Sequence, residues 1–409
     1  MRRVAVTGIG VVSALGNTPA KLFENLMRGI SGIRKITPDY SMPLSGKLAA
    51  TVDFDPLAHF TKKQIKALDR VSQIALVASS QAWADAGLVL DDEGKKRSGV
   101  SLGTGMGGAR SLDEVCSDLY KNEASRVSPL YIIKIMANAP ASHISIQYGL
   151  SGPCLTYSTA CSSSSVAVGE AFRQIKAGYA DVMIAGGTES LITPVSFKCW
   201  ESLGVLALED AEDPSSSCRP FSKDRTGFVL GEGAAVVVVE EMERAKKRDA
   251  KIYGELIGYG STADAHHITG PTVSGQAHAM NQAIEEAKIT LDEIDYINAH
   301  GTATVANDNV ETQAIKTVFG DRALRIPVSS TKSMHGHLMG AAGVVELVVS
   351  LLAIKNKAVP PTANLRVPDP ECDLDYVPNV GRTGVNVRTV MSNSFAFGGT
   401  NAVIVAREA

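Results

Sequence analysis

Short apolar runs and amphipathic stretches alternate along the chain. Residues 181–187 and 234–240 are apolar over most of their length, which is typical of strands buried on both faces. Apolar residues recur at helical spacing in four further segments, 22–27, 74–86, 167–176 and 340–354. Strands that alternate with helices predict an α/β fold built of stacked layers.

Two parts of the chain repeat the same order of features. Residues 82–108 and 283–304 each contain the end of a helix, a short polar stretch and an apolar strand that ends in small residues and Gly. Glycine at a strand end lets the backbone approach a ligand closely. We therefore predict two related α/β halves, residues 1–250 and 251–409, that pack as one unit.

The bulk composition changes this picture little. The chain has 409 residues, of which 44% are hydrophobic and 20% charged, so it can build a substantial core. A net charge of -3 gives no support to nucleic-acid binding. Six scattered cysteines without a CxxC pair indicate neither a disulfide framework nor a zinc ribbon.

The chain shows no clear targeting or membrane segment. Arg2 and Arg3 precede an apolar stretch, as in a signal peptide, but Thr7 and two glycines interrupt it, which favours a first strand. The longest later apolar run, 338–354, contains Glu346 and is shorter than a membrane span. We expect a cytoplasmic protein with no membrane span.

Cys161 lies between a predicted strand, 155–160, and a predicted helix, and four serines follow it. The start of a helix stabilises a thiolate and supplies N–H groups for an oxyanion, which favours a nucleophile. The alternatives are a small buried cysteine, a nucleophilic serine or a polar loop. A serine nucleophile prefers a G-x-S-x-G elbow, which is absent, so we interpret the serines as small, capping residues.

Three other Gly-rich segments, 298–304, 330–346 and 392–401, also follow predicted strands. We expect them to converge with Cys161 at one edge of the sheets. His300 and His337 lie in the first two segments, and a cysteine with two histidines in such settings points to a catalytic site.

These motifs resemble those of the β-ketoacyl-acyl-carrier-protein synthases of types I and II, which belong to the thiolase-like superfamily. The resemblance covers essentially the whole chain and keeps the family's order. Its motifs are Thr-Ala-Cys-Ser, Asn-Ala-His-Gly-Thr, Lys-Ser-x-x-Gly-His-x-x-Gly-Ala-Ala-Gly and Asn-Ser-Phe-x-Phe-Gly-Gly-Thr-Asn. The fold that it implies has duplicated βαβαβαββ halves in α-β-α-β-α layers.

The resemblance also implies an acyltransferase reaction. Cys161 would accept an acyl chain from acyl-carrier protein as a thioester, and malonyl-carrier protein would lose CO2 and attack it. His300 and His337 would donate hydrogen bonds from neutral imidazoles, and Lys332 would order the site and tune its electrostatics. No cofactor is expected, because the phosphopantetheine arm of the carrier protein holds the substrates. The product would enter fatty acid or polyketide-like biosynthesis, such as that of aryl polyenes.

Secondary sites follow from the same matching. Phe395 and Phe397 resemble an aromatic gate, Thr302 and Thr304 the residues that hold the phosphopantetheine arm, and Met106 a residue that narrows the acyl pocket near a dimer interface. Basic residues in docking positions are Lys62, Lys63, Lys66 and Arg126. A monovalent-cation site would comprise Asn298, Glu311, Glu346, Ser392 and Asn393, although Glu346 could pair with Lys332 instead.

Several positions depart from the family pattern. His335 stands where threonine is common in the family. With His300 and His337 it could form a three-histidine zinc centre, so a zinc or thiol hydrolase is an alternative function. Ala396 replaces a usual glycine and would stiffen the gate loop. An acidic run at 209–213 would weaken docking of an acidic carrier protein. A non-catalytic chain-length partner is the other alternative. We expect a homodimer, with a heterodimer as the variant.

Overall fold

The computed structural model describes residues 1–36 and 47–409. Ten strands form one hydrogen-bonded sheet in the order β11-β10-β14-β15-β9-β1-β8-β6-β4-β5. Their bounds are β1 Val4–Val12, β4 Ser98–Gly103, β5 Cys154–Tyr157, β6 Val182–Glu189, β8 Gly233–Glu241, β9 Gly254–Ala263, β10 Tyr296–Asn298, β11 Val328–Ser329, β14 Thr389–Phe395 and β15 Thr400–Arg407.

The helices and the short strands complete the described chain. The helices are α1 Pro19–Met27, α2 Lys62–Ala67, α3 Arg70–Ala86, α4 Asp92–Lys96, α5 Ala109–Tyr120, α6 Leu130–Ile135, α7 Ala139–Tyr148, α8 Ser163–Lys176, α9 Pro194–Ser202, α10 Met242–Lys247, α11 Val273–Ala287, α12 Val305–Phe319, α13 Lys332–His335 and α14 Ala342–Asn356. Two smaller sheets contain β2 Arg34–Lys35, β3 Leu48–Ala50 and β7 Leu230–Gly231, and β12 Ala358–Val359 and β13 Arg382–Thr383.

The two halves of the sheet repeat one topology. From the centre outward the first half has β1, β8, β6, β4 and β5, and the second has β9, β15, β14, β10 and β11. In both halves the two inner pairs are antiparallel and the two outer pairs are parallel. Each half therefore runs βαβαβαββ along the chain, and the predicted duplication is confirmed.

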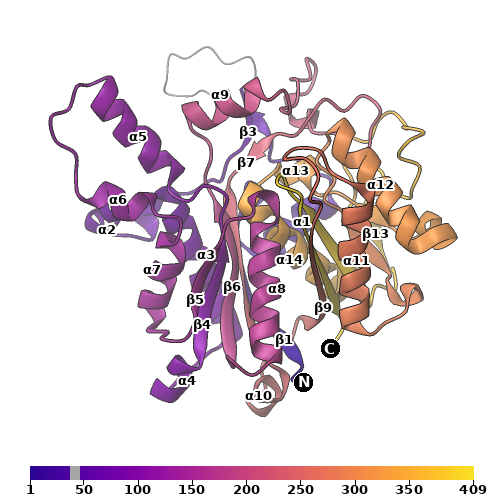
Figure 1. Cartoon of the computed structure of the whole chain (residues 1–409), viewed down its shortest axis with the longest axis horizontal. Coiled ribbons are helices and arrows are strands. Elements are labelled where there is room, and N and C mark those ends of the chain that lie inside the picture. The colour runs from indigo at the N-terminus through magenta and orange to yellow at the C-terminus, as the bar shows by residue number, and fades with distance from the viewer. Residues whose placement is uncertain (37–46) are drawn as a thin grey trace.

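Five layers follow from this topology (Figure 1). Helices α3 and α7 cover the outer face of the first half, α11 and α12 cover that of the second, and α8 and α14 lie between the halves. The halves are joined, because β1 pairs with β9 over Val4–Val6 and Gly254–Leu256. The layers thus contain one continuous sheet wrapped around two central helices. The sequence pattern did not predict the pairing of β1 with β9 that joins the two halves of this sheet.

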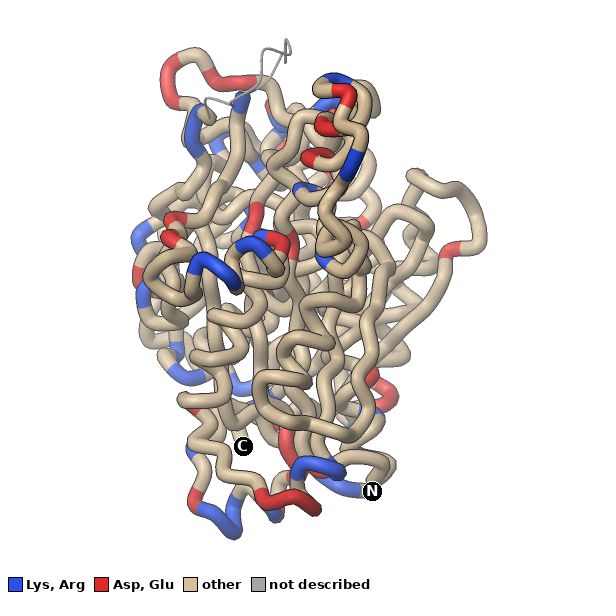
Figure 2. The backbone as a smooth tube through the Cα atoms, turned by 90° about the vertical axis from the view of Figure 1, so that its left-hand side faces the viewer, with Lys and Arg blue, Asp and Glu red and all other residues tan. Residues whose placement is uncertain are grey.

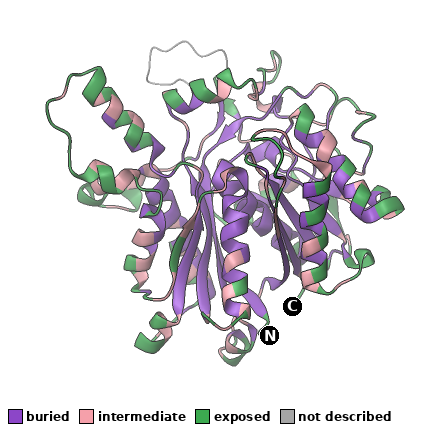
Figure 3. Ribbon diagram, in the orientation of Figure 1, coloured by how far each residue is buried: buried purple, intermediate pink, exposed green. Residues whose placement is uncertain are grey.

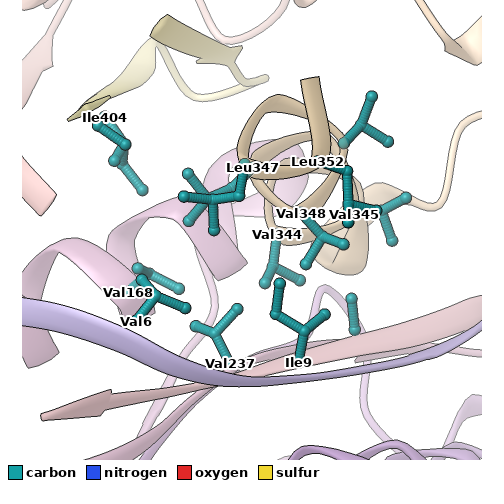
Figure 4. Packing of buried hydrophobic residues seen from close by; sticks show 14 of the residues in the cluster. Val6, Ile9, Val168, Val237, Val344, Val345, Leu347, Val348, Leu352 and Ile404 are labelled. Carbon is teal, nitrogen blue, oxygen red and sulfur yellow. The ribbon is translucent and has the colours of Figure 1, made fainter. Parts of the chain in front are cut away.

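Most strands of the sheet and the central helix α14 are almost entirely buried, and α8 is buried on most of its surface (Figure 3). Apart from Glu346 and Ser350, the buried side chains of helix α14 are apolar, and Val344, Val348 and Leu352 belong to one core cluster with Ile9 of β1 and Val237 of β8 (Figure 4). By length and composition Met339–Asn356 could cross a membrane, but 89% of it is buried inside the fold. No second helix of that kind occurs in 1–36 and 47–409. Burial on every side explains the all-round hydrophobicity of α14.

Small residues bring the two central helices together. A Cβ atom on Gly343 of α14 would lie 2.0 Å from the hydroxyl oxygen of Ser165 on α8. The Ser165 hydroxyl is also 2.8 Å from that of Ser394, and the Ser164 hydroxyl accepts a hydrogen bond from Val344 N–H at 3.0 Å. The serines after Cys161 are therefore buried packing residues, as interpreted from the sequence. The expected capping of their own helix is wrong, because no side chain among the described residues caps the start of α8 and Ser164 instead binds an N–H group of α14.

Candidate active site

Cys161 lies in a sharp turn between β5 and α8. The strand ends at Tyr157, earlier than predicted, and Ala160 adopts a left-handed conformation with φ of 49°. A 3₁₀ turn over Ala160–Ser162 then leads into α8. A non-glycine residue with positive φ stores strain, and such turns occur at functional sites. The turn aims the Cys161 side chain toward the second half of the molecule.

The Cys161 sulfur faces hydrogen-bond donors from both halves. His337 Nε2 lies 3.2 Å away, and the backbone N–H groups of Phe397 and of Cys161 itself also point to the sulfur. The sequence suggested an N–H donor at the helix start, but nothing in it indicated the second donor on the 396–399 loop. Two converging N–H groups form an oxyanion site beside the nucleophile.

Burial dominates the acidity of the free thiol. It raises the pKa of Cys161 to about 11, although Lys332 and the N–H groups act in the opposite direction. The N–H group at the helix start therefore acts in the predicted direction, but burial outweighs it and the net shift of the Cys161 pKa in the free enzyme is upward. The physical reason is that Cys161 is only 7% exposed, and the desolvation of a thiolate outweighs one helix end.

His300 is held at the end of β10 by a buried carboxylate. Glu311 of α12 accepts hydrogen bonds from the N–H groups of His300 and Gly301, both at 2.8 Å. Gly301 has φ of 38°, and a Cβ there would lie 2.5 Å from Ser330. These contacts explain why Gly follows the histidine. The His300 ring lies 5.5 Å from that of His337, with 81° between their planes.

The contacts of His337 define its tautomer. Its Nδ1 accepts a hydrogen bond from Met339 N–H at 3.2 Å, so the proton lies on Nε2, which faces Cys161. Burial, and then the charge of Lys332, lower the pKa of both His300 and His337 well below the ordinary range. Both imidazoles are thus neutral at physiological pH, which is the state expected from the sequence.

Lys332 is entirely buried and is not a surface lysine. Its ammonium donates to the carbonyl of His300 at 2.6 Å and lies 3.4 Å from His300 Nδ1. It also forms an ion pair with Glu346 of α14, one of the two roles considered for this glutamate. Burial raises the pKa of Glu346 to about 7 even though Lys332 acts to lower it. The lysine therefore connects His300 to the central helix.

The structure links the residues of the expected cation site in pairs: β10 pairs Asn298 with Ser392 on β14, and Asn393 Nδ2 donates a hydrogen bond to Glu311 at 3.2 Å. Four of them carry buried oxygens without a hydrogen-bond partner, namely Asn298 Oδ1, Glu346 Oε2, Ser392 Oγ and Asn393 Oδ1. Glu311 differs, since both of its oxygens already accept N–H donors. Carboxylate, amide and hydroxyl oxygens suit a hard cation, so the donor set fits.

One cavity is lined by most of the residues expected at the active site. Its lining includes the expected residues Cys161, His300, His337, Thr302, Thr304, Phe395 and Phe397. The Thr302 and Thr304 hydroxyls lie 2.9 Å apart on its wall. Met106 does not line this cavity, and its side chain is 52% exposed on the loop after β4. The expected acyl-pocket role of Met106 therefore has no support within one chain.

An aromatic wall encloses the cavity. Trp200 of α9 stacks on Phe397 with 6.0 Å between ring centroids, and it meets Phe228 edge-on at 5.6 Å. Phe228 in turn lies edge-on to His337 at 5.2 Å. The sequence analysis missed both aromatic residues. Their signal was weak, since each stands alone in its segment, and only the fold places them beside the gate loop.

The basic residues expected to dock a carrier lie outside the cavity. Lys62, Lys63 and Lys66 are exposed on α2, and Arg126 is exposed between α5 and α6. These elements lie on the same side of the molecule, where basic and acidic segments are mixed (Figure 2). The structure places all four of them on the surface.

Two residues of the acidic run at 209–213 form ion pairs within the chain. Asp210 forms ion pairs with Arg219 and Arg366, and Glu209 pairs with Lys35. The run therefore presents less net negative charge to a partner than the sequence indicated. This corrects the expectation that it opposes an acidic carrier.

The three-histidine zinc centre is wrong. His335 turns away from the cavity, and its ring contacts the Thr331 hydroxyl at 2.9 Å and the Gly336 carbonyl at 2.7 Å. Within the described residues, the group that could hold a metal is Cys161 with His300 and His337, whose ligand atoms lie within 4.8 Å of one another. The spacing of His335 and His337 misled because α13 ends between them.

Comparisons with known proteins agree with this geometry. Residues 1–245 match the family described as "Beta-ketoacyl synthase, N-terminal domain", and residues 253–366 match "Beta-ketoacyl synthase, C-terminal domain". The chain is 44% identical to 3-oxoacyl-(acyl-carrier-protein) synthase 2 of Coxiella burnetii over 407 residues, which are 99% of this chain and 98% of that protein. It is 43% identical to the protein of the same name from a Synechocystis strain, over 100% of this chain and 98% of that one.

A solved structure extends the comparison. It is described as a type II PKS acyl-carrier protein in complex with its ketosynthase bound to the hexaketide. It matches with a TM-score of 0.92 and 34% identity over 100% of this chain and 99% of that chain. Fold, motifs and full-length identity agree, and the chain belongs to the β-ketoacyl synthase family.

Proposed function

We propose that the protein is a 3-oxoacyl-acyl-carrier-protein synthase, which joins an acyl thioester on Cys161 to malonyl-carrier protein with loss of CO2. One observation carries the proposal. The Cys161 sulfur lies in a largely apolar cavity, 3.2 Å from a neutral imidazole of His337 and beside a second neutral imidazole and two backbone N–H groups. This arrangement suits a thioester intermediate and a developing enolate.

The first step transfers the acyl group. The sulfur of Cys161 attacks the acyl-carrier thioester carbonyl, and the C–S bond to the phosphopantetheine arm breaks. The N–H groups of Phe397 and Cys161 stabilise the negative oxygen of the intermediate, and the thiol proton leaves with the pantetheine sulfur. With its pKa raised to about 11, free Cys161 is mostly the thiol at neutral pH, so its proton has to be transferred to the leaving pantetheine sulfur as the acyl group is exchanged.

The second step forms the carbon–carbon bond. The malonyl carboxylate leaves as CO2, and the thioester enolate that remains is stabilised by hydrogen bonds from His300 and His337. Its carbon attacks the acyl carbonyl on Cys161, and the Cys161 sulfur leaves and takes up a proton. The product is a β-ketoacyl thioester on the carrier, two carbons longer than the acyl chain.

The outer residues bind and admit the substrates. Thr302 and Thr304 lie on the cavity wall, where their hydroxyls can hold the phosphopantetheine arm. Phe395 and Phe397 form the gate, and Ala396 stiffens the loop between them. Lys62, Lys63, Lys66 and Arg126 contribute to docking an acidic carrier protein.

A monovalent cation fits beside this site. Asn298, Glu346, Ser392 and Asn393 would hold it through their unpartnered oxygens, with Glu311 at the edge of the set. No reaction step passes through it, and the enzyme needs no other cofactor.

A second copy of the chain completes the assembly. Apolar side chains are exposed along α5–α7 and at the edge strand β5, including Leu119, Ile132, Ile146 and Leu155. Paired burial of such a surface is typical of a dimer interface. Met106 lies on this side and would reach an acyl pocket only at that interface. A related subunit could replace the second copy, and we expect the dimer in the cytoplasm.

Intact-protein mass spectrometry tests the proposal. Incubation with acyl-carrier proteins of different chain lengths should add one acyl group to the wild type and none to Cys161→Ala. Cys199→Ala, which removes an exposed cysteine, is the matched control and should be acylated. No adduct with any carrier would contradict the proposal. Stoichiometric zinc in the purified protein would instead favour a hydrolase that uses the Cys161–His300–His337 group.

A further inference from the structure

A buried carboxylate gathers backbone N–H groups next to the active site. Glu189 ends β6, and its side chain has no exposed surface. Its Oε2 accepts hydrogen bonds from Gly105 N–H at 2.6 Å and Gly340 N–H at 3.0 Å. Its Oε1 accepts from the Thr104 hydroxyl at 3.3 Å and from Met106 N–H at 3.4 Å. Glu189 thus binds the loop after β4 to the turn before α14.

This carboxylate site requires glycine on both sides. A Cβ on Gly340 would lie 2.7 Å from Glu189 Oε2 and 2.4 Å from Gly105 N. A Cβ on Gly105 would lie 2.7 Å from the same oxygen. Contacts this short do not occur for real side chains, so the two glycines let the backbone close around the carboxylate. The site is built into the fold.

The turn that Glu189 holds also defines the tautomer of His337. Gly340 follows Met339, whose N–H donates to His337 Nδ1 at 3.2 Å. Met339 has φ of 43°, a strained conformation that persists only where surrounding contacts hold it. The hydrogen bond from Gly340 to Glu189 is the adjacent contact. Loss of that bond frees the peptide that keeps the His337 proton on Nε2.

We propose that Glu189 is a positioning residue for the condensation step, holding the Met339–Gly340 turn so that His337 presents its Nε2–H to the substrate. The inference rests on the proposed function. Glu311 acts in the same way in the second half, where it binds the N–H groups of His300 and Gly301. Each histidine therefore has its own buried carboxylate, which binds the backbone and not the ring.

The charge of Glu189 has a separate effect on the nucleophile. It raises the pKa of Cys161 in addition to the effect of burial, while Lys332 lowers it. Burial raises the pKa of Glu189 itself to about 7. Glu189→Gln removes this charge and supplies an N–H donor where an acceptor is needed. The variant should lose His337 alignment and at the same time shift the alkylation profile of Cys161 to lower pH.

The test separates two partial reactions of the full-length protein. In Glu189→Gln we expect acyl transfer to Cys161 within about twofold of wild type and decarboxylation of malonyl-carrier protein slower by on the order of 10- to 100-fold. Glu189→Asp keeps the charge and should recover part of the decarboxylation. The matched control is Glu240→Gln, a buried carboxylate at the opposite end of the sheet, since the β6–β8 register pairs Glu189 with Gly233 and Glu240 with Val182. The Glu240→Gln substitution should change neither acyl transfer nor decarboxylation.

The outcomes distinguish the possible failures. If both partial reactions fall together in Glu189→Gln, or decarboxylation is unchanged, the inference is overturned. If Glu189→Gln does not fold, the Asp variant must show the same selective loss on a smaller scale. A wild type that performs neither reaction would contradict the proposed function, and with it the positioning role that rests on it, whereas a selective change confined to Glu189→Gln bears on the positioning role alone.

Discussion

His337 Nε2 lies 3.2 Å from the Cys161 sulfur, while its Nδ1 is already occupied by the N–H of Met339. The ring can therefore donate a hydrogen bond into the cavity but has no free lone pair there to accept the thiol proton. We infer that the histidines act as hydrogen-bond donors in the second step and not as bases in the first.

Removal of either histidine should separate the two steps. His300→Ala and His337→Ala should still acquire an acyl group on Cys161 but lose malonyl decarboxylation by about 100-fold or more, because the enolate oxygen loses one donor. Rapid-quench assays with radiolabelled malonyl-carrier protein measure the second step directly. Unimpaired condensation in both variants would show that these roles are wrong. His335→Thr, which alters a ring outside the cavity, is the matched control and should keep both steps.

The reactivity of Cys161 toward alkylation should be low at neutral pH. A shift from the ordinary value of 9.0 to about 11 reduces the thiolate fraction by about 100-fold near pH 7.5. The alkylation rate should rise about tenfold per pH unit until it levels near pH 11. Peptide mapping after iodoacetamide treatment measures this rate, with exposed Cys199 as the internal control. A plateau below pH 8 would contradict the effect of burial.

Replacing only one partner of the Lys332–Glu346 ion pair should lower the free energy of unfolding strongly. Lys332→Met leaves a buried carboxylate without its cation, which typically lowers the free energy of unfolding by about 3–5 kcal/mol. The double variant Lys332→Met/Glu346→Gln should recover much of that loss, since no unpaired charge remains. Urea unfolding of the four proteins in this cycle measures the coupling. Additive losses would show that the pair does not couple.

The stack of Trp200 on Phe397 should restrict the gate loop. Trp200→Leu removes an aromatic contact worth about 0.5–1.5 kcal/mol and should speed acylation by long chains by about 2- to 10-fold. Short acyl chains, which need less opening, should be affected less. Acylation rates over a series of carrier-bound chain lengths provide the measurement. The control is Trp83→Leu, whose ring stacks on Tyr148 away from the cavity and should leave the chain-length profile unchanged.

Much of the fold could be predicted from the sequence because it depends on local periodicity. The runs at 181–187 and 234–240 became β6 and β8, and the echo of 82–108 in 283–304 reflects α3–β4 and α11–β10. The junction of β1 with β9 could not be predicted. It depends on backbone hydrogen bonds between residues about 250 positions apart, which carry no side-chain pattern.

The site was predictable where motifs carried it. Cys161, His300 and His337 were identified from short segments at strand ends, and Lys332 from the family resemblance. The cavity brings the first three together, and Lys332 contacts the backbone of His300. Properties that depend on three-dimensional burial were not accessible. The pKa of Cys161, the partnership of Trp200 with the gate, the exposure of Met106 and the orientation of His335 each depend on neighbours far away in the chain.

The junction between β1 and β9 has a mechanical consequence. Cys161 belongs to one half and the two histidines to the other, so a hinge between the halves would pull the reactive groups apart. The continuous sheet and the shared pair of central helices prevent such a hinge. Substrates therefore cannot enter by a movement of one half away from the other, which is how they enter enzymes whose two domains open and close around the site. Opening must be local, and a small displacement of the 396–399 loop is the motion that the architecture leaves available.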